Sequence, residues 1–265
     1  MKEQLIIADA HVHLHDYFDL NLLFDSALNN FHNHAQKEAN RDNYAAILLL
    51  TEISGQNKFN EVKKYTLGDN QLENWNVSTT QENVSLSISD RSNRHLFLIA
   101  GRQIVTAENL EVLALITEEN FTDGLSLEVT IHQIIQSNGI PVLPWGVGKW
   151  MGQRGKLLNK LLAENNFPMM FLGDNSGRPV FWSRPVQFQQ AEKQGMRILP
   201  GTDPLPLNSE VSRPGSFGFT IKNSLNCDRP GEHLKQMLLD PHISLQPYGS
   251  LESPLRFVCN QLAMR

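Results

Sequence analysis

Short hydrophobic runs recur along the whole chain, and helix-like segments separate several of them. Short apolar runs bounded by polar or turn-forming residues are typical of buried strands. We expect strands at residues 5–13, 45–51, 96–104, 111–116, 140–145, 169–172 and 197–200. Strands that alternate with helical patterns indicate βαβ units and a parallel sheet.

Two of these expected strands follow the same local pattern. One helix-like segment ends at Gly139 before the strand at 140–145, and another ends at Gly195 before the strand at 197–200. Glycine at such a position supplies the left-handed conformation that ends many helices. The repeated order of helix, glycine and strand predicts an α/β fold of the TIM-like (β/α) barrel type. In that fold the carboxyl ends of the strands surround the active site.

Residues 65–93 break this rhythm, because they are rich in Asn, Ser, Thr and Gln and alternate in polarity from Val84 to Ile88. We interpret this segment as a β-hairpin insertion beside the barrel. Residues 204–214 are rich in proline and serine and predict a long loop, whereas 233–239 and 255–264 predict C-terminal helices. One barrel commonly takes about 250 residues, so we expect residues 1–265 to form a single domain.

The composition is that of an ordinary globular protein, with 40% apolar and 19% charged residues. The net charge of −5, without a basic cluster, predicts no nucleic-acid partner. The chain has no apolar stretch long enough for a membrane span, and its first residues lack the features of a signal peptide. Two cysteines, Cys227 and Cys259, cannot form a disulfide framework. We therefore expect a cytoplasmic protein without a membrane partner and leave its oligomeric state open.

The first hydrophobic run carries the clearest candidate chemistry. It contains Asp9, His11 and His13, with His15 just beyond. Side chains alternate along a strand, so these residues point to one face. A carboxylate and several imidazoles are costly to bury unless they hold a metal ion or form a tight hydrogen-bond network. The run therefore predicts a metal site at the first strand.

A second pair with the same spacing, His32 and His34, provides a comparison within the chain. It lies in a polar segment that is helical or a loop, where side chains two positions apart do not face each other. We interpret these two as surface histidines.

Asp203 follows the last expected strand. In a barrel that strand closes next to the first, so Asp203 would approach His11 and His13. It could bind a metal ion there and accept a proton from an attacking water. The alternative is a turn residue, or a helix N-cap before Pro204.

Three further polar residues follow apolar runs. Asp174 and Glu52 each come after an expected strand and are candidate metal ligands, although Asp174 equally fits an Asx-type turn. Arg178 could grip a substrate phosphate or carboxylate through its planar guanidinium group; the alternative is an ordinary surface arginine.

With Asp9 to His13 and Gly201 to Asp203 together, the chain resembles the PHP (polymerase and histidinol phosphatase) domain family and the wider amidohydrolase superfamily. Both begin with a His-x-His strand and end with an Asp at a strand end. About seven expected strands fit the seven-stranded PHP barrel better than the eight-stranded amidohydrolase barrel.

Several metal ligands that the resemblance implies are missing from this chain. Thr51-Glu52 stands where PHP enzymes usually carry Asp-His, and Gln103 stands where they carry a Glu ligand. Their terminal Asp-x-His corresponds to Asp203-Pro204-Leu205, which lacks the histidine. The resemblance therefore implies a reduced site of one or two ions.

The residues and the resemblance together predict a metal-dependent hydrolase, phosphoesterase-like, that uses a metal-activated water. His11, His13 and Asp203, helped by Asp174 or Glu52, would bind Zn, Mn or Fe. Asp203 would also be the general base, and Arg178 would hold a small anionic substrate. Two alternatives stay open: an amidohydrolase that acts on a C–N bond, and a catalytically degenerate barrel, with or without metal, that binds a small molecule or a protein.

Overall fold

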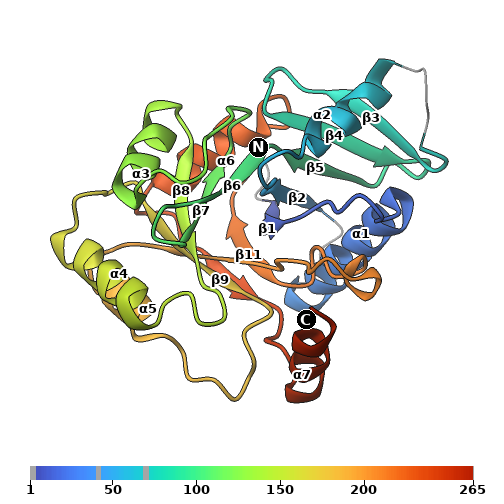
Figure 1. Cartoon of the computed structure of the whole chain (residues 1–265). Helices are drawn as coiled ribbons and strands as arrows, with labels where there is room; N and C mark the ends of the chain where they lie inside the picture. Colours follow the sequence, from blue (N-terminus) through green and yellow to red (C-terminus); the bar gives the residue numbers. More distant parts are fainter. Residues whose placement is uncertain (1–3, 40–42, 68–71, 265) are drawn as a thin grey trace.

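The computed structural model describes residues 4–39, 43–67 and 72–264, and within them the chain forms two mixed β-sheets with helices packed around them (Figure 1). The described helices do not include one with the length and apolarity that crossing a bilayer requires.

The larger sheet has seven strands in the order β12-β11-β1-β2-β5-β4-β3. β1, β2 and β5 are parallel, and the remaining neighbours are antiparallel. The bounds of its strands in chain order are β1 Leu5–Val12, β2 Tyr44–Leu50, β3 Trp75–Thr79, β4 Ser85–Asp90, β5 His95–Ile99, β11 Gly218–Lys222 and β12 Gln246–Tyr248.

The smaller sheet has five strands in the order β10-β9-β8-β7-β6, of which β8, β9 and β10 are parallel. Its strands are β6 Gly101–Val105, β7 Glu111–Leu115, β8 Ile140–Pro144, β9 Phe171–Asn175 and β10 Ile198–Gly201. The helices are α1 Leu20–Ala39, α2 Lys58–Lys63, α3 Leu127–Gln136, α4 Gly152–Glu164, α5 Val186–Lys193, α6 Pro230–Leu239 and α7 Pro254–Ala263, with short 3-10 turns η1 Lys64–Leu67 and η2 Asn208–Glu210.

Strand β1 lies between two hydrophobic cores and is buried along its whole length. Ile6, Ala8 and Ala10 face the core shared with the smaller sheet, whereas Leu5 and Ile7 face the core under α1. Burial on both faces explains why this strand is apolar at nearly every position.

The predicted closed barrel is wrong, although the α/β class is right. The two sheets have separate strand orders, and among the described residues the backbone hydrogen bonds between them are isolated ones, such as those of Glu52 with Gly101 and Gln103. The reason is the strand directions. The hairpins β3–β4–β5 and β6–β7–β8 run antiparallel, and they interrupt the repeated βα units that a closed parallel barrel needs.

The chain passes from one sheet to the other in the middle of an expected single strand. Residues 96–104 form two strands, β5 and β6, which separate at Ala100. A side chain at Gly101 would overlap the backbone carbonyls of Leu50 and Ala114, so glycine allows the crossing. Periodicity did not predict this break, because the run at 96–104 contains no turn-forming residue apart from Gly101 itself.

The expected hairpin exists as β3 and β4, but both strands continue the larger sheet instead of standing beside it. Residues 68–71 of the predicted 65–93 segment lie outside the described residues, as do residues 1–3 and 265 of the predicted single domain. Strands β11 and β12 were not predicted. β11 pairs antiparallel with β1.

The Asp9 carboxylate links the larger sheet to the smaller one. Its side chain is fully buried and accepts hydrogen bonds from Thr202 N (2.8 Å), Thr202 Oγ1 (2.6 Å) and Gly215 N (2.9 Å). The backbone N of His11 donates a fourth, at 3.2 Å. Burial raises the Asp9 pKa to about 6, although these donors act in the opposite direction.

Asp9→Asn should lower the free energy of unfolding by about 2–3 kcal/mol, because the new amide NH2 must face groups that are themselves donors. Urea unfolding would measure this loss. Asp25→Asn, the same change on α1 where the carboxylate makes no hydrogen bond or ion pair within the described residues, should alter stability by less than about 0.5 kcal/mol. Equal stability of the two variants would contradict this role of Asp9.

Candidate metal centre

Three side chains converge where β1 and β10 end: those of His11, His13 and Asp203. The two histidine Nε2 atoms lie 3.1 Å apart, and each lies 3.3 Å from Asp203 Oδ1. The structure thus brings together the residues of the two sequence motifs, which are 190 positions apart (203 − 13).

Local backbone geometry creates this convergence. β1 places His11 on the strand and His13 just past its end. At the end of β10, a Cβ on Gly201 would overlap the backbone of His11, so only glycine lets the two strands approach this closely. Asp203 then takes a left-handed backbone conformation (φ 49°) and donates its N–H to the His11 carbonyl at 2.8 Å. Aspartate tolerates this conformation better than most residues.

The hydrogen-bonding capacity of these groups is mismatched without a cation. His11 Nε2 faces His13 Nε2, Asp203 Oδ1 and also Gln103 Oε1, at 3.1 Å. An imidazole nitrogen carries at most one hydrogen, so it cannot satisfy all three neighbours. Tetrahedral Zn with bonds of about 2.0–2.2 Å separates its ligand atoms by about 3.3–3.6 Å. The observed separations of 3.1–3.3 Å lie at or just below this range, so the donor set fits one divalent ion.

The protonation states also suit metal binding. Burial lowers the pKa of His11, against the opposing effect of Asp203, and this favours the neutral imidazole that binds metals. Burial tends to raise the pKa of Asp203, but His11, His13 and Arg213 together bring it well below its usual range. Asp203 is therefore a carboxylate at neutral pH.

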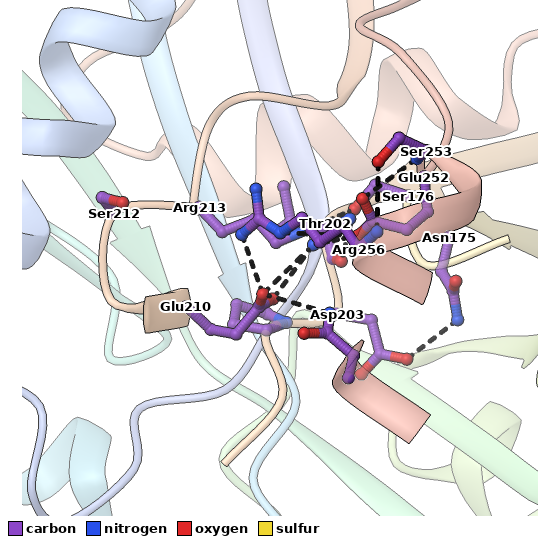
Figure 2. A network of polar contacts seen from close by, with 12 residues as sticks. Asn175, Ser176, Thr202, Asp203, Glu210, Ser212, Arg213, Glu252, Ser253 and Arg256 are labelled. Atoms are coloured by element: carbon purple, nitrogen blue, oxygen red, sulfur yellow. Dashed lines mark hydrogen bonds and ion pairs between the residues drawn. The ribbon is translucent and has the colours of Figure 1, made fainter. Parts of the chain in front are cut away.

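Asn175, at the end of β9, holds the Asp203 carboxylate in place. Its Nδ2 donates to Asp203 Oδ2 at 2.8 Å (Figure 2). The same Nδ2 donates to the Trp145 carbonyl at 2.9 Å. The sequence did not single out Asn175, because the expected strand ended at residue 172. With β9 extending to Asn175, strand alternation would have directed attention to it.

A buried ion-pair network lies next to Asn175 and Asp203 (Figure 2). Arg213 donates to Ser176 Oγ at 2.8 Å and to the carboxylates of Glu252 (2.6 Å) and Glu210 (3.1 Å). Arg256 of α7 donates to Glu210 at 2.8 Å. The network anchors α7 beside the metal centre, and no sequence motif indicated it.

A cavity of about 330 Å³ opens beside Asp203, which is 27% exposed. Trp145, Leu205 and Phe257 give it apolar walls. Lys149 and Glu111 border it as an ion pair of 2.9 Å. The volume is that of a site for a small ligand or a reacting group.

Asp174 and Arg178 do not join this cluster. Asp174 precedes Asn175 on β9, so its side chain points to the opposite face. There Arg178 binds it through two hydrogen bonds, of 2.9 and 2.7 Å. The ion pair therefore holds both side chains away from the three candidate ligands.

Glu52 also lies elsewhere. Its buried carboxylate pairs with Arg102 and accepts the backbone N–H of Phe59, at the seam between the two sheets. Burial raises its pKa, and Arg102 acts in the opposite direction. His15 likewise stands apart, with its Nε2 2.9 Å from the Pro204 carbonyl.

Comparisons of the whole structure show which known proteins share this fold. PsfC from Pseudomonas syringae PB-5123 matches with a TM-score of 0.54 and 13% identity, over 100% of this chain and 98% of PsfC. The lesion-specific endonuclease PfuEndoQ from Pyrococcus furiosus matches with a TM-score of 0.55 and 9% identity, over 93% of this chain and 59% of the endonuclease. An Endonuclease Q complex with a 27-mer duplex substrate gives 0.48 and 10%, over 89% of this chain and 56% of that one.

At 13% and 9% identity, PsfC and PfuEndoQ show a likeness of fold alone. Comparison with protein-family models gives no match, and comparison with curated protein sequences gives none either.

The expectation that the chain has no nucleic-acid partner does not hold. It rested on a net charge of −5 and the lack of a basic cluster. The structural comparisons include a lesion-specific endonuclease, so the fold occurs in a protein that acts on nucleic acid. Net charge is summed over the whole surface and says little about one site.

The wild-type chain should bind one equivalent of Zn. His11→Ala and His13→Ala should each weaken the Zn affinity by more than about 100-fold. Removing a residue that only hydrogen-bonds to a metal ligand already costs about 10–100-fold, and removing a ligand itself should cost more. Competition with a chromophoric chelator would measure this. His95→Ala, at the start of β5, should leave the affinity unchanged. Equal Zn affinity of the His11 and His95 variants would contradict the site.

Glu52→Gln should leave the Zn stoichiometry unchanged and lower the free energy of unfolding by about 3 kcal/mol, because it leaves the Arg102 charge buried without its partner. Glu61→Gln, which breaks the more exposed pair with Lys58, should cost less than about 1 kcal/mol. Metal analysis and urea unfolding on the same samples would separate the two roles. If Glu52→Gln lost Zn while its stability stayed unchanged, Glu52 would be identified as a metal ligand.

Proposed function

We propose that this protein is a metal-dependent hydrolase that acts on a phosphoester, with one ion held by His11, His13 and Asp203. The observation that carries the proposal is the convergence of their three ligand atoms at separations of 3.1–3.3 Å, next to a cavity. Two histidines and a carboxylate are a common catalytic zinc set, and Mn and Fe also accept these donors.

A divalent ion at such a site lowers the pKa of a bound water towards neutrality and polarises the bond under attack. The residues of the chain have separate roles. His11 and His13 bind as neutral imidazoles. Asp203 borders the cavity and is the carboxylate placed to accept the proton of an attacking water. Asn175 fixes the orientation of that carboxylate through its 2.8 Å hydrogen bond.

Lys149 and Arg213 are the cationic side chains that border the cavity, so we assign the binding of an anionic substrate group to them. Arg178, the sequence-based candidate for this role, does not border it and is bound to Asp174. Of the two, Lys149 is the more exposed, at 30%, and its partner Glu111 can release it towards a ligand.

One feature favours a second candidate, a binding module without catalysis. Gln103 presents a neutral amide oxygen to His11, where the resembled enzymes carry a charged ligand. An amide is a weaker ligand than a carboxylate, so the site keeps fewer strong donors than a full hydrolase centre. The assay below separates the two candidates.

With Zn, Mn or Fe(II) added, the protein should hydrolyse members of a panel of phosphomonoesters and phosphodiesters. Asp203→Asn should lower kcat/KM by at least about 100-fold. Asn175→Ala should lower kcat by about tenfold with little change in KM, because it acts only through Asp203. Asp25→Asn, remote from the site on α1, is the matched carboxylate control and should keep full activity.

The panel should also contain amides and cyclic amides. Turnover of these substrates alone would show that the bond cleaved is a C–N bond and not a phosphoester. Stoichiometric metal without turnover of any substrate would favour the binding module. Turnover that persists in Asp203→Asn would contradict the assigned centre.

A further inference from the structure

A second cavity, of about 620 Å³, lies beside the metal centre and is separate from it. Arg213 and Glu252 border both cavities, whereas Asp203 borders only the smaller one. The walls of the larger cavity come from α1, from the loop at 212–216 and from the segment 248–256. Figure 2 shows the side chains of Arg213, Glu252 and Arg256 in the ion-pair network, with Ser212 preceding Arg213 on the same loop.

The charged groups around this cavity are mostly cationic. Lys37, Arg213 and Arg256 border it, against the single carboxylate of Glu252. The two arginines are already held by Glu210 and Glu252. Lys37, on the last turn of α1, has no ion-pair partner among the described residues. Its charge is therefore available to a ligand.

The neutral groups of the walls are hydrogen-bond donors of the kind that bind oxyanions. Four serines border the cavity: Ser176, whose hydroxyl is already bonded to the Thr202 carbonyl and to Arg213, and Ser212, Ser216 and Ser250. Hydroxyls of this kind supply hydrogen bonds to phosphate oxygens, and Lys adds a point charge. A phosphate group offers several strong acceptor oxygens, which suits a wall that combines hydroxyls with cations.

His34 adds an unused polar group. Its ring borders the cavity and stacks on Tyr248 with the ring centroids 4.1 Å apart. Its Nε2 is buried and has no hydrogen-bond partner. A buried polar atom without a partner is uncommon in proteins and calls for an explanation. The second His-x-His pair is thus not merely a pair of surface histidines, because His34 faces this cavity while His32 stays exposed.

We propose that this cavity is a binding site for a phosphate group, free or carried on a small organic molecule, recognised by Lys37, His34 and the facing serine hydroxyls. The cavity has the volume of a small-molecule site and exceeds what a single phosphate fills. The site does not depend on the metal centre, so it stands or falls independently of the hydrolase proposal.

Calorimetric titration of the chelator-treated full chain tests the site, because phosphate cannot then bind through a metal ion. Inorganic phosphate and glycerol phosphate should each bind saturably, with one site per chain. Lys37→Glu should weaken binding by at least about tenfold, as the loss of a charge-assisted hydrogen bond does. The matched control Lys156→Glu, an exposed lysine of α4 without an ion pair in the described residues, should change the affinity by less than about twofold.

His34→Phe keeps a ring against Tyr248 and removes both ring nitrogens, so it should weaken binding without loss of stability. Tighter binding of glycerol phosphate than of inorganic phosphate would identify a carried phosphate, and equal binding would identify the free ion. Three results would overturn the proposal: no saturable binding, equal affinities in Lys37→Glu and Lys156→Glu, or loss of binding in Asp203→Asn with Lys37→Glu unaffected.

Discussion

The buried carboxylate of Asp9 is the interaction on which the geometry of this protein depends. It accepts hydrogen bonds from β1, from Thr202 after β10 and from Gly215 in the following loop. A buried carboxylate is costly unless donors surround it, so the three segments must stay together for it to be satisfied. The hydrogen bonds that compensate its burial also hold the two sheets in register where the candidate ligands lie.

The candidate metal centre is built from groups that repel or compete when no cation is present. His11 Nε2 lies 3.1 Å from both His13 Nε2 and Gln103 Oε1, and the Asp203 carboxylate adds a negative charge 3.3 Å away. The chain keeps this arrangement through backbone constraints: a glycine at 201 that admits close approach, and a left-handed Asp203. Strain of this kind is common at functional sites, where the surrounding structure must hold it.

Arg213 connects the two cavities. It is buried, it bonds to Ser176, Glu210 and Glu252, and it lowers the pKa of Asp203. A ligand in the larger cavity would therefore lie against a side chain whose charge acts on the metal centre. Helix α7 depends on the same network through Arg256, so the wall of the smaller cavity and the electrostatics of the site share one set of ion pairs.

The sequence alone determined the α/β class and most of the strands, because apolar runs and strand alternation are local properties. It also singled out His11, His13 and Asp203, whose side chains the structure brings together. It could not determine that the sheets stay separate, because strand direction and the break at Ala100 depend on contacts with Leu50 and Ala114. Asp174, Glu52 and Arg178 matched the pattern of strand-end chemistry, yet the tertiary structure turns each towards an ion-pair partner. A strand-end charge reaches the site only if its side chain points to the right face of the sheet. That depends on where each strand ends and on how the strands pack.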